Sequence, residues 1–348
     1  IESVIDSTNG FIVESHNPKM IADKLHVSIS EPVNLNGITH STTSSIGITL
    51  FSHKTQGTNE LLKEADLALY QAKASGRNAI RFFDDEMHTQ FAEKTNLEAS
   101  LRRALDKGEL SLAYQPQVDQ LGRIIGAEAL LRWESSGSDA ISPDVFIPIA
   151  EEGGLIVPIG EWALQSACSQ LASWAQSPST SDLVLSVNIS AKQFRRPNFV
   201  EMVRSIVRTT GVNPNLLKLE LTESLLLEDV DAVITTMSTL RKIGVKFSID
   251  DFGTGYSSLS YLKKLPLDEI KIDKSFVLDI AWDEGDRAII RSILSLAQSL
   301  KLRVIAEGVE TIEQRDYLFA EGCCFYQGYL YGRPLSDENF RLLLKSLG

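Results

Sequence analysis

Residues 110–133, LSLAYQPQVDQLGRIIGAEALLRW, decide the fold that we predict for this chain. Two apolar runs rich in β-forming residues, 110–119 and 123–133, are separated only by a tight turn at 120–122. A parallel crossover needs a dozen or more residues, so these two strands are expected to pair antiparallel. The sheet that follows therefore begins with a hairpin.

Beyond this hairpin, short β-type runs alternate with helical segments. The further runs are LVLSVNIS (183–190), LKLELTES (217–224), VKFSIDDF (245–252), EIKIDKSF (269–276), RVIAEGVE (303–310) and CCFYQGYL (323–330). The helical segments cover 146–176, 199–210, 228–243, 286–300 and 311–320. Eight strands, most of them separated by a helix, predict an irregular (β/α)8 TIM-like barrel with an antiparallel first strand.

The residues before the barrel predict a smaller α/β piece. Its expected elements are a helix at 18–30, a hairpin-like pair at 33–51, a helix at 58–78 and a strand at 79–83. We expect three parts: a partial α/β domain at 1–83, a linker helix at 84–108 and the barrel at 109–348. The chain begins at Ile1 without methionine, which indicates a piece of a longer protein.

The composition limits the class of protein. Of 348 residues, 43% are hydrophobic and 23% charged, which is ordinary for a globular protein. No apolar run reaches the roughly 18 residues that cross a bilayer, and no signal peptide opens the chain. A net charge of −12 argues against a nucleic-acid polymer as partner. An odd number of cysteines, Cys168, Cys323 and Cys324, suits a reducing compartment and indicates a cytoplasmic location.

Polar residues stand at the C-terminal ends of seven of the eight expected strands. One such residue is as easily explained as a cap of the next helix, but a set of seven is not. Because chemistry in such barrels gathers at that end, the set is a candidate active site. Its members are Glu128, Asn188, Glu220, Asp250 with Asp251, Lys271, Glu307 and Gln327.

The residue types in this set indicate a site for hard cations. All five histidines precede residue 109, so the barrel offers neither a histidine-ligated zinc nor a histidine general base. Carboxylates and an amide oxygen suit Mg²⁺ or Mn²⁺, and Ca²⁺ can bind as well. Five acids in one barrel mouth can hold two cations, an arrangement that cleaves phosphate esters.

Two of these acids, Asp250 and Asp251, are adjacent in the sequence. Successive side chains of a strand point to opposite sides, so both can serve one site only where the strand breaks into its loop. Gly253 and Gly255 are expected to provide that break, because glycine tolerates backbone angles that other residues avoid.

At these residues the sequence resembles the EAL-domain phosphodiesterases that linearise cyclic di-GMP. The resemblance spans residues 109–345 and is carried by seven ordered motifs: GAEALLRW, SVNIS, LKLELTES, SIDDFGTGYSSLSYL, IKIDKSFV, VIAEGVET and YQGYLYGRPL. Upstream, SSIGITLF and ADLALYQAKASGRNAIRFF resemble the C-terminal part of a GGDEF domain. The GGDEF signature itself would lie before Ile1.

The resemblance implies a role for each residue of the candidate site. The residues that match metal ligands are Glu128, Asn188, Glu220, Asp250 and Asp251. Lys271 matches a lysine that positions the attacking water. Glu307 matches a glutamate that serves as general base or as a partner of the second metal. With Glu128, these two form the expected catalytic group.

Other matches concern the substrate and a loop. Gln115, Arg132 and Gln327 match substrate contacts, and Arg132 suits a phosphate because its guanidinium is planar and always charged. An ion pair of Arg132 with a rim acid, and a plain strand-end role for Gln115, are the alternatives. Glu223 matches the glutamate that holds the loop at 252–258, whereas the alternative is an acid near a helix N-terminus.

The resemblance implies metal-dependent hydrolysis of cyclic di-GMP to linear pGpG by a cyclic-guanylate-specific phosphodiesterase. It implies Mg²⁺ or Mn²⁺ at a two-metal site, with Ca²⁺ bound but inhibitory. The alternative is a catalytically silent cyclic di-GMP receptor; such relatives lose metal ligands or the loop motif, and no such loss occurs at the positions named above. A glycosidase needs two carboxyls but not the surrounding asparagine, lysine and further acids. The resemblance also implies a homodimer through the barrel, and membrane contact only through a region upstream of Ile1.

Overall fold

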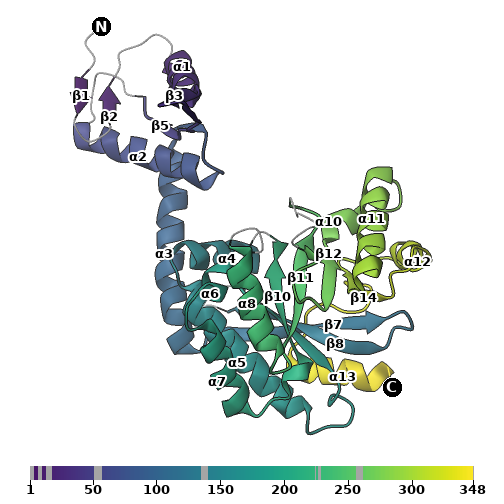
Figure 1. Ribbon diagram of the computed structural model, residues 1–348. Coiled ribbons are helices and arrows are strands. Elements are labelled where there is room, and N and C mark those ends of the chain that lie inside the picture. The colour runs from purple at the N-terminus through teal and green to yellow at the C-terminus, as the bar shows by residue number, and fades with distance from the viewer. Residues whose placement is uncertain are drawn as a thin grey trace. The chain divides into compact units, whose positions relative to one another are not determined.

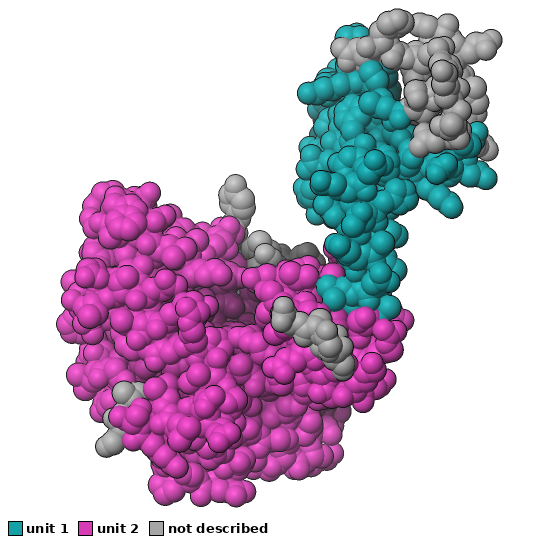
Figure 2. Space-filling view, turned by 180° about the vertical axis from the view of Figure 1, so that it is seen from behind, with its two compact units in different colours: residues 1–99 teal, residues 100–348 magenta. Residues whose placement is uncertain are grey.

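The computed structural model describes residues 4–6, 10–12, 18–50, 57–134, 140–223, 225, 229–255 and 262–347. The chain folds into two compact units, residues 1–99 and 100–348, shown in teal and magenta in Figure 2. Among the described residues, no helix combines the length and the apolar character that crossing a bilayer requires.

The first unit is a small α/β arrangement. Its helices are α1 (Pro18–Ser30) and α2 (Thr58–Ala74). Antiparallel pairs form between β1 (Val4–Asp6) and β2 (Gly10–Ile12) and between β3 (Val33–Leu35) and β4 (Ile38–His40), whereas β5 (Ile46–Ile48) pairs parallel with β6 (Ile80–Phe82). The hairpin predicted over 33–51 is therefore too long, because residues 46–48 pair with β6 instead. A Cβ on Gly47 would lie 2.1 Å from the Leu69 nitrogen, so glycine is needed where β5 meets α2.

The helix α3 (Asp85–Lys107) follows β6 and carries the boundary between the two units. Its last two turns belong to the second unit, where Leu101 and Ala104 are fully buried. The helix covers nearly the range expected for a linker. The division into parts at 1–83, 84–108 and 109–348 stays a prediction.

The second unit is a closed barrel of eight strands (Figure 1). The strands are β7 (Leu110–Asp119), β8 (Ile124–Trp133), β9 (Val184–Asn188), β10 (Leu217–Thr222), β11 (Lys246–Phe252), β12 (Glu269–Ile272), β13 (Arg303–Ala306) and β14 (Phe325–Gln327). β7 pairs antiparallel with both of its neighbours, β14 and β8, and the other neighbouring pairs are parallel. The predicted irregular barrel with an antiparallel first strand is confirmed.

Helices connect most of the strands. They are α4 (Pro143–Glu152), α5 (Ile156–Trp174), α6 (Ala191–Phe194), α7 (Phe199–Thr210), α8 (Val230–Arg241), α10 (Lys274–Leu278), α11 (Glu284–Leu300), α12 (Ile312–Ala320) and α13 (Asp337–Leu347). The single helix predicted over 146–176 is wrong, because the chain turns at Gly153 and Gly154, the latter with a left-handed φ of +74°. The helices α6, α10 and α13 were not predicted.

The barrel interior is polar, and the apolar faces of the strands pack against the helices. In β10, three fully buried leucines alternate with Lys218 and Glu220, which therefore share the opposite face. Lys218 forms a buried ion pair with Glu269, and Ser248 Oγ donates to the same carboxylate over 3.4 Å. This polar lining continues along the barrel interior to the C-terminal ends of the parallel strands, where the candidate site lies.

Candidate active site

Lys271 stands at the centre of the predicted site. The side chain is fully buried, and its Nζ lies near carboxylates from four segments of the barrel. The distances from Nζ are 2.6 Å to Glu220 Oε2, 2.6 Å to Glu307 Oε1, 3.0 Å to Asp250 Oδ1 and 3.2 Å to Glu128 Oε2. One positive charge is thus shared by four acids, and the cluster keeps an excess of negative charge.

Strand register brings these side chains together. Glu220 of β10 is in register with Asn188 of β9, and residues in register on parallel neighbours share a face of the sheet. Glu307 follows β13, and its backbone nitrogen donates to the Ile272 carbonyl oxygen over 3.1 Å. The convergence therefore results from barrel closure and not from proximity along the sequence.

Asp250 and Asp251 both reach the site region because β11 is irregular. The register against β12 shifts between Ile249 and Phe252, and Asp251 adopts a left-handed φ of +53°. This conformation is uncommon for a residue with a Cβ and is concentrated at functional sites. The break begins at Asp251, within the strand, and the predicted Gly253 continues it directly after the strand with a left-handed φ of +102°.

Amide side chains hold Glu128. Asn188 Nδ2 donates to Glu128 Oε1 over 2.6 Å, and Gln327 Nε2 donates to Glu128 Oε2 over 2.5 Å. Gln327 Nε2 also donates to Gln115 Oε1 over 3.1 Å, and its Oε1 accepts from Gln117 Nε2 over 2.9 Å. Gln117 was not predicted, although its spacing of two from Gln115 places both on one face of β7.

The carboxylates form two overlapping groups that fit metal ions. Within each group the ligand atoms lie within 4.8 Å of one another, and Asp250 belongs to both: Glu128, Glu220 and Asp250; Asp250, Asp251 and Glu307. Within these two groups, the buried oxygens Glu220 Oε1 and Asp250 Oδ1 have no hydrogen-bond partner among the described residues. Lys271 lies close to Asp250 Oδ1 but is not aligned to donate to it. Because unpaired buried carboxylate oxygens are costly, this oxygen-donor set suits hard divalent cations.

Burial raises the pKa values of three of these acids. The pKa of Glu220 rises to about 8 through burial, although Lys271 opposes the shift. Burial followed by the charge of Asp250 raises the pKa of Asp251 to about 6. Burial also raises the pKa of Glu307 well above its usual value. Each of these three acids gains from a cation that replaces its proton.

The pKa values of Glu128 and Lys271 shift in the directions that favour the charged form of each side chain. Burial alone would raise the pKa of Glu128, but Lys271 and the amides of Gln327 and Asn188 hold it below its usual value. Burial alone would lower the pKa of Lys271, but Asp250 and the other carboxylates raise it well above normal. The ammonium group is therefore a fixed positive charge in the site.

Arg132 lies in β8, four residues beyond Glu128, and is partly buried. Its Nη1 donates to the Leu131 carbonyl oxygen over 2.8 Å. Within the described ranges, no acid forms an ion pair with Arg132. The alternative of a rim ion pair is thus not seen there, and much of the guanidinium fork is free for an anionic ligand.

Glu223 contacts the segment that follows β11. Its Oε2 accepts a hydrogen bond from Gly253 N over 3.1 Å, and a Cβ on Gly255 would lie 2.8 Å from its Oε1. Glu223 is buried, with 2% of its surface exposed, so this contact is not that of a solvated helix cap. The loop predicted over 252–258 is described only to residue 255, and the rest lies outside the described residues.

Asp273 is a further acid near the site that was not predicted. It is buried, accepts a hydrogen bond from Ser275 N over 3.0 Å at the start of α10, and contributes to the raised pKa of Asp251. Its position two residues after Lys271 is the signal that would have placed it on the same face.

Two protein-family models match the chain. Residues 98–334 match the EAL domain, and residues 13–79 match the model described as diguanylate cyclase, GGDEF domain.

Two similar proteins come from Pseudomonas aeruginosa. The bifunctional diguanylate cyclase/cyclic di-GMP phosphodiesterase MucR is 42% identical over 331 residues, covering 94% of this chain and 48% of MucR. The cyclic di-GMP phosphodiesterase NbdA is 39% identical over 325 residues, covering 93% of this chain and 41% of NbdA. The chain thus spans less than half the length of either relative. A solved structure, the PaMucR phosphodiesterase in complex with c-di-GMP, superposes with a TM-score of 0.69 at 45% identity, covering 70% of this chain and 99% of that chain.

Proposed function

The chain belongs to the EAL domain family, and we propose that its barrel hydrolyses cyclic di-GMP to linear pGpG. The observation that carries this proposal is the pair of carboxylate groups that share Asp250, at the C-terminal ends of the barrel strands. An acidic site with two overlapping oxygen-donor groups suits cleavage of a phosphodiester. The two Pseudomonas relatives, both named as cyclic di-GMP phosphodiesterases, support the choice of substrate.

The first cation would be held by Glu128, Asn188, Glu220 and Asp250, and the second by Asp250, Asp251 and Glu307. When bound, a pair of Mg²⁺ or Mn²⁺ ions supplies the positive charge that stabilises the attacking and leaving oxygens of the phosphodiester. Ca²⁺ fits the same oxygens but demands less regular geometry. We therefore expect it to bind and to inhibit turnover.

The chain's own residues bind and orient the substrate. Arg132 holds a non-bridging phosphate oxygen, because its guanidinium has no acidic partner within the described chain. Gln115 and Gln327 form one hydrogen-bonded pair beside Glu128, and the second amide hydrogen of Gln115 Nε2 is left to donate to the ligand. The catalytically silent receptor differs from this proposal only at the chemical step.

Two residues act on the attacking water. Lys271 Nζ orients the water and offsets the negative charge that builds on the phosphoryl oxygens. Glu307 is less deeply buried than Glu220, with 16% of its side chain exposed against 0%. As the alternative to holding the second cation, the Glu307 carboxylate at the edge of the cluster is placed to accept the proton of that water.

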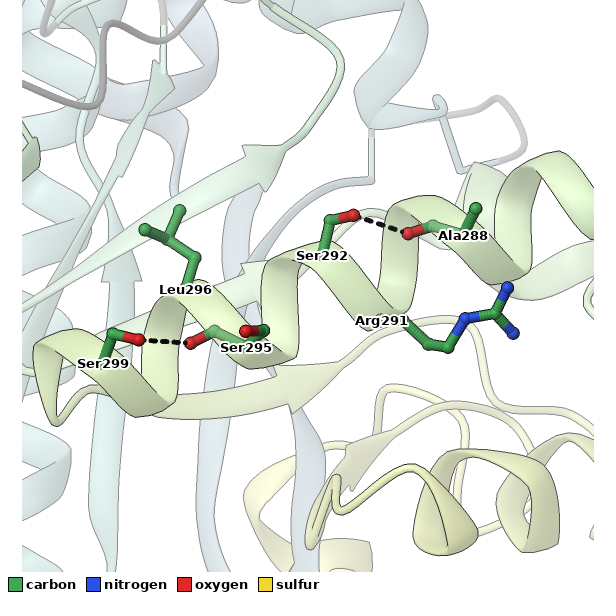
Figure 3. A pocket seen from close by; sticks show the side chains of 6 residues that line it. All are labelled: Ala288, Arg291, Ser292, Ser295, Leu296 and Ser299. Atoms are coloured by element: carbon green, nitrogen blue, oxygen red, sulfur yellow. Dashed lines mark hydrogen bonds between the residues drawn. The ribbon is translucent and has the colours of Figure 1, made fainter.

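We also propose that the barrel forms a homodimer along α11. Two adjoining pockets share Ala288, Ser292 and Leu296 of this helix, and one of them extends to Glu223 and Gly253. Figure 3 shows that the six residues lining one pocket, Arg291 and Leu296 among them, all lie on this helix, and Ser292 Oγ donates to the Ala288 carbonyl oxygen over 2.7 Å. Four of these six residues, Ala288, Ser292, Ser295 and Ser299, are small, which leaves room for the close approach of a second helix.

The location and partners follow from composition. All three cysteines are free thiols, which suits a reducing compartment, and we place this part of the protein in the cytoplasm. The acidic net charge of −12 favours a small ligand held by local cations over a nucleic-acid polymer.

The test is to incubate the chain with cyclic di-GMP and Mg²⁺ and to follow pGpG by chromatography. We expect pGpG to form in Mg²⁺ or Mn²⁺ and to be absent with chelator or in Ca²⁺. Glu128→Gln, which keeps the size of the side chain, should abolish most turnover. Binding of cyclic di-GMP without any pGpG in either activating metal would favour the receptor instead.

A further inference from the structure

A buried ion pair without a role in the chemistry above lies one layer below the site in the barrel interior. Lys218 and Glu269 are both buried, and Lys218 Nζ lies 2.5 Å from Glu269 Oε1. Within the described residues, neither side chain forms a second ion pair. Such a pair is weak evidence for stability, because an apolar pair of similar size often stabilises a core as well. Its place beneath the site residues indicates another role.

Each partner stands two residues before a site residue on the same strand. In β10 Lys218 precedes Glu220, and in β12 Glu269 precedes Lys271. The alternate residues of β12, both isoleucines, belong to the apolar core outside the barrel, so Glu269 and Lys271 both point to the interior. Two ion pairs therefore join β10 to β12, Lys218 with Glu269 below and Lys271 with Glu220 at the site.

The two ion pairs have opposite polarity. β10 supplies the cation of the lower pair and the carboxylate of the upper pair, whereas β12 does the reverse. Every charge is therefore near an opposite charge on its own strand as well as on the other strand. Successive inward residues of a strand are roughly 6.6 Å apart, at about 3.3 Å per residue, which is within reach of a flexible lysine side chain.

This arrangement gives Lys271 a competing partner for its contacts in the site. The ammonium group has three hydrogens to donate and lies near four carboxylates, two of them at 2.6 Å. The Glu269 carboxylate would be a fifth if it had no partner of its own. It is occupied instead by the ion pair with Lys218 and by a 3.4 Å hydrogen bond from Ser248 Oγ, both at Oε1.

We propose that Lys218 is a positioning residue for the reaction: by pairing with Glu269, it keeps that carboxylate from drawing the Lys271 ammonium out of the site. This role rests on the proposed function, in which Lys271 orients the attacking water. An unpaired buried carboxylate is strongly unfavourable, so without Lys218 the side chain of Lys271 turns toward Glu269. Because Lys271 acts on the transition state, the loss appears in kcat and not in KM.

The test is steady-state hydrolysis of cyclic di-GMP by Lys218→Met, alone and combined with Glu269→Leu. Methionine keeps the length of the lysine stem but leaves Glu269 unpaired. We expect kcat to fall about 10-fold or more, but not beyond the loss on the order of 10²–10³-fold for a missing preorganised donor, with KM unchanged. The double variant removes the competing carboxylate as well, so most of the wild-type kcat should return. A crystal structure of Lys218→Met should show Lys271 Nζ within hydrogen-bond distance of Glu269.

The chain offers a matched control at the start of β12. Arg241 Nη2 forms an ion pair with Asp268, the residue before Glu269, over 3.1 Å, and both side chains are partly exposed. Arg241→Met removes the same kind of contact without leaving a buried carboxylate unpaired, and should keep the wild-type kcat and KM. The melting temperature of each metal-free variant, and its binding of cyclic di-GMP in Ca²⁺, show whether the fold and the ligand site persist. If Lys218→Met does not fold, Lys218→Gln, which keeps a donor without the charge, takes its place with the same expectations.

The outcomes separate this inference from the proposed function. If the wild type forms no pGpG in Mg²⁺ or Mn²⁺, the proposed function fails and this role fails with it. If the wild type is active and the folded Lys218 variant keeps kcat within two-fold, only the positioning role is refuted. A double variant as slow as the single one would also overturn it, because the loss would then come from Lys218 itself and not from the unpaired carboxylate.

Discussion

The ammonium group of Lys271 occupies the place where four carboxylates meet, and it offsets part of their mutual repulsion. Because it lies 2.6 Å from both Glu220 and Glu307, it holds the acids together at a spacing that cations can use. Replacing one member of such a buried cluster leaves the others unpaired, which typically costs about 3–5 kcal/mol. The lysine is therefore structural and chemical at once.

This dual role predicts that Lys271→Met lowers turnover but increases the gain in Tm that Mg²⁺ produces. Turnover should fall on the order of 10²–10³-fold, the effect of removing one preorganised donor, as measured by pGpG formation. The metal-free protein should melt lower, but the gain in Tm on adding Mg²⁺ should be larger, because unpaired carboxylates attract the cation more strongly. Cyclic di-GMP binding in Ca²⁺ should persist through Arg132 and Gln115. Wild-type kcat in this variant would remove Lys271 from the reaction.

The raised pKa values predict that cation binding depends on pH. The pKa of Glu220 is about 8 in the folded chain against about 4.3 in an unfolded one. The protonated form is thus favoured in the folded state, so the contribution of Glu220 to the stability of the metal-free protein is lost as pH rises through about 8. A divalent cation replaces that proton, so the Mg²⁺-induced rise in Tm should grow between pH 6 and 8.5. An increment that stays constant over this range, or that Glu220→Gln leaves unchanged, would contradict the assignment.

The sequence predicted which residues form the candidate site, but it did not predict the contacts between their side chains. A polar residue at each strand end predicts a shared site because parallel strands end on one side of a barrel. The distances from Lys271 depend on closure of the whole barrel, which no local pattern encodes. Gln117 and Asp273 were missed because each is a second polar residue on a strand or just beyond its end, where a polar side chain is unremarkable taken alone.

At the scale of elements, an irregularity in β11 lets the side chains of two adjacent acids reach the same site. A regular strand would point Asp250 and Asp251 to opposite faces. The left-handed φ of +53° at Asp251 and the shifted register change this at a conformational cost of order 1–3 kcal/mol. Sequence pattern favours glycine for such turns, which is why the break was predicted at Gly253. The break includes this glycine, whose φ is +102°, but it begins two residues earlier, at Asp251.

Other element boundaries were predicted where the hydrophobic pattern changes sharply. β7 and α7 match their expected ranges of 110–119 and 199–210. The two helices α4 and α5 were predicted as one because an apolar run resumes at Leu155, directly after the turn at 153–154. The short helices α6 and α10 contain too few residues to show a helical period.

The contact of Glu223 with the segment after β11 predicts a kinetic effect from a residue outside the cation groups. Glu223→Ala removes the acceptor of the Gly253 N–H bond. Residues 253–255 are then less firmly positioned, and the orientation of the Asp250 and Asp251 side chains is less well defined. Turnover should drop and the Mg²⁺ concentration for half-maximal activity should rise. Glu223→Gln keeps an oxygen acceptor and should recover much of both. A lower Tm with unchanged kinetics would instead favour helix capping.

At the scale of the molecule, the first unit and the barrel are two compact units, and the boundary between them lies within α3. The match of residues 13–79 to a GGDEF model and of 98–334 to the EAL model places the two families in tandem. All acids assigned to cation binding lie in the barrel. We therefore expect the chemistry to reside there, and the assembly state to depend on the barrel surface.

The groove along α11 predicts that two chains associate through the barrel. Ser292 is exposed in the centre of this groove, so Ser292→Arg should block close approach of a second helix without disturbing the core. Gln298→Arg adds the same charge to an exposed position of α11 that does not line either pocket and serves as the control. Sedimentation at micromolar concentration should show a dimer for the wild type and Gln298→Arg, and a monomer for Ser292→Arg. Because the groove adjoins Glu223 and Gly253, the monomer should also turn over more slowly. A wild type that sediments only as a monomer with full activity would show that α11 is an ordinary surface helix.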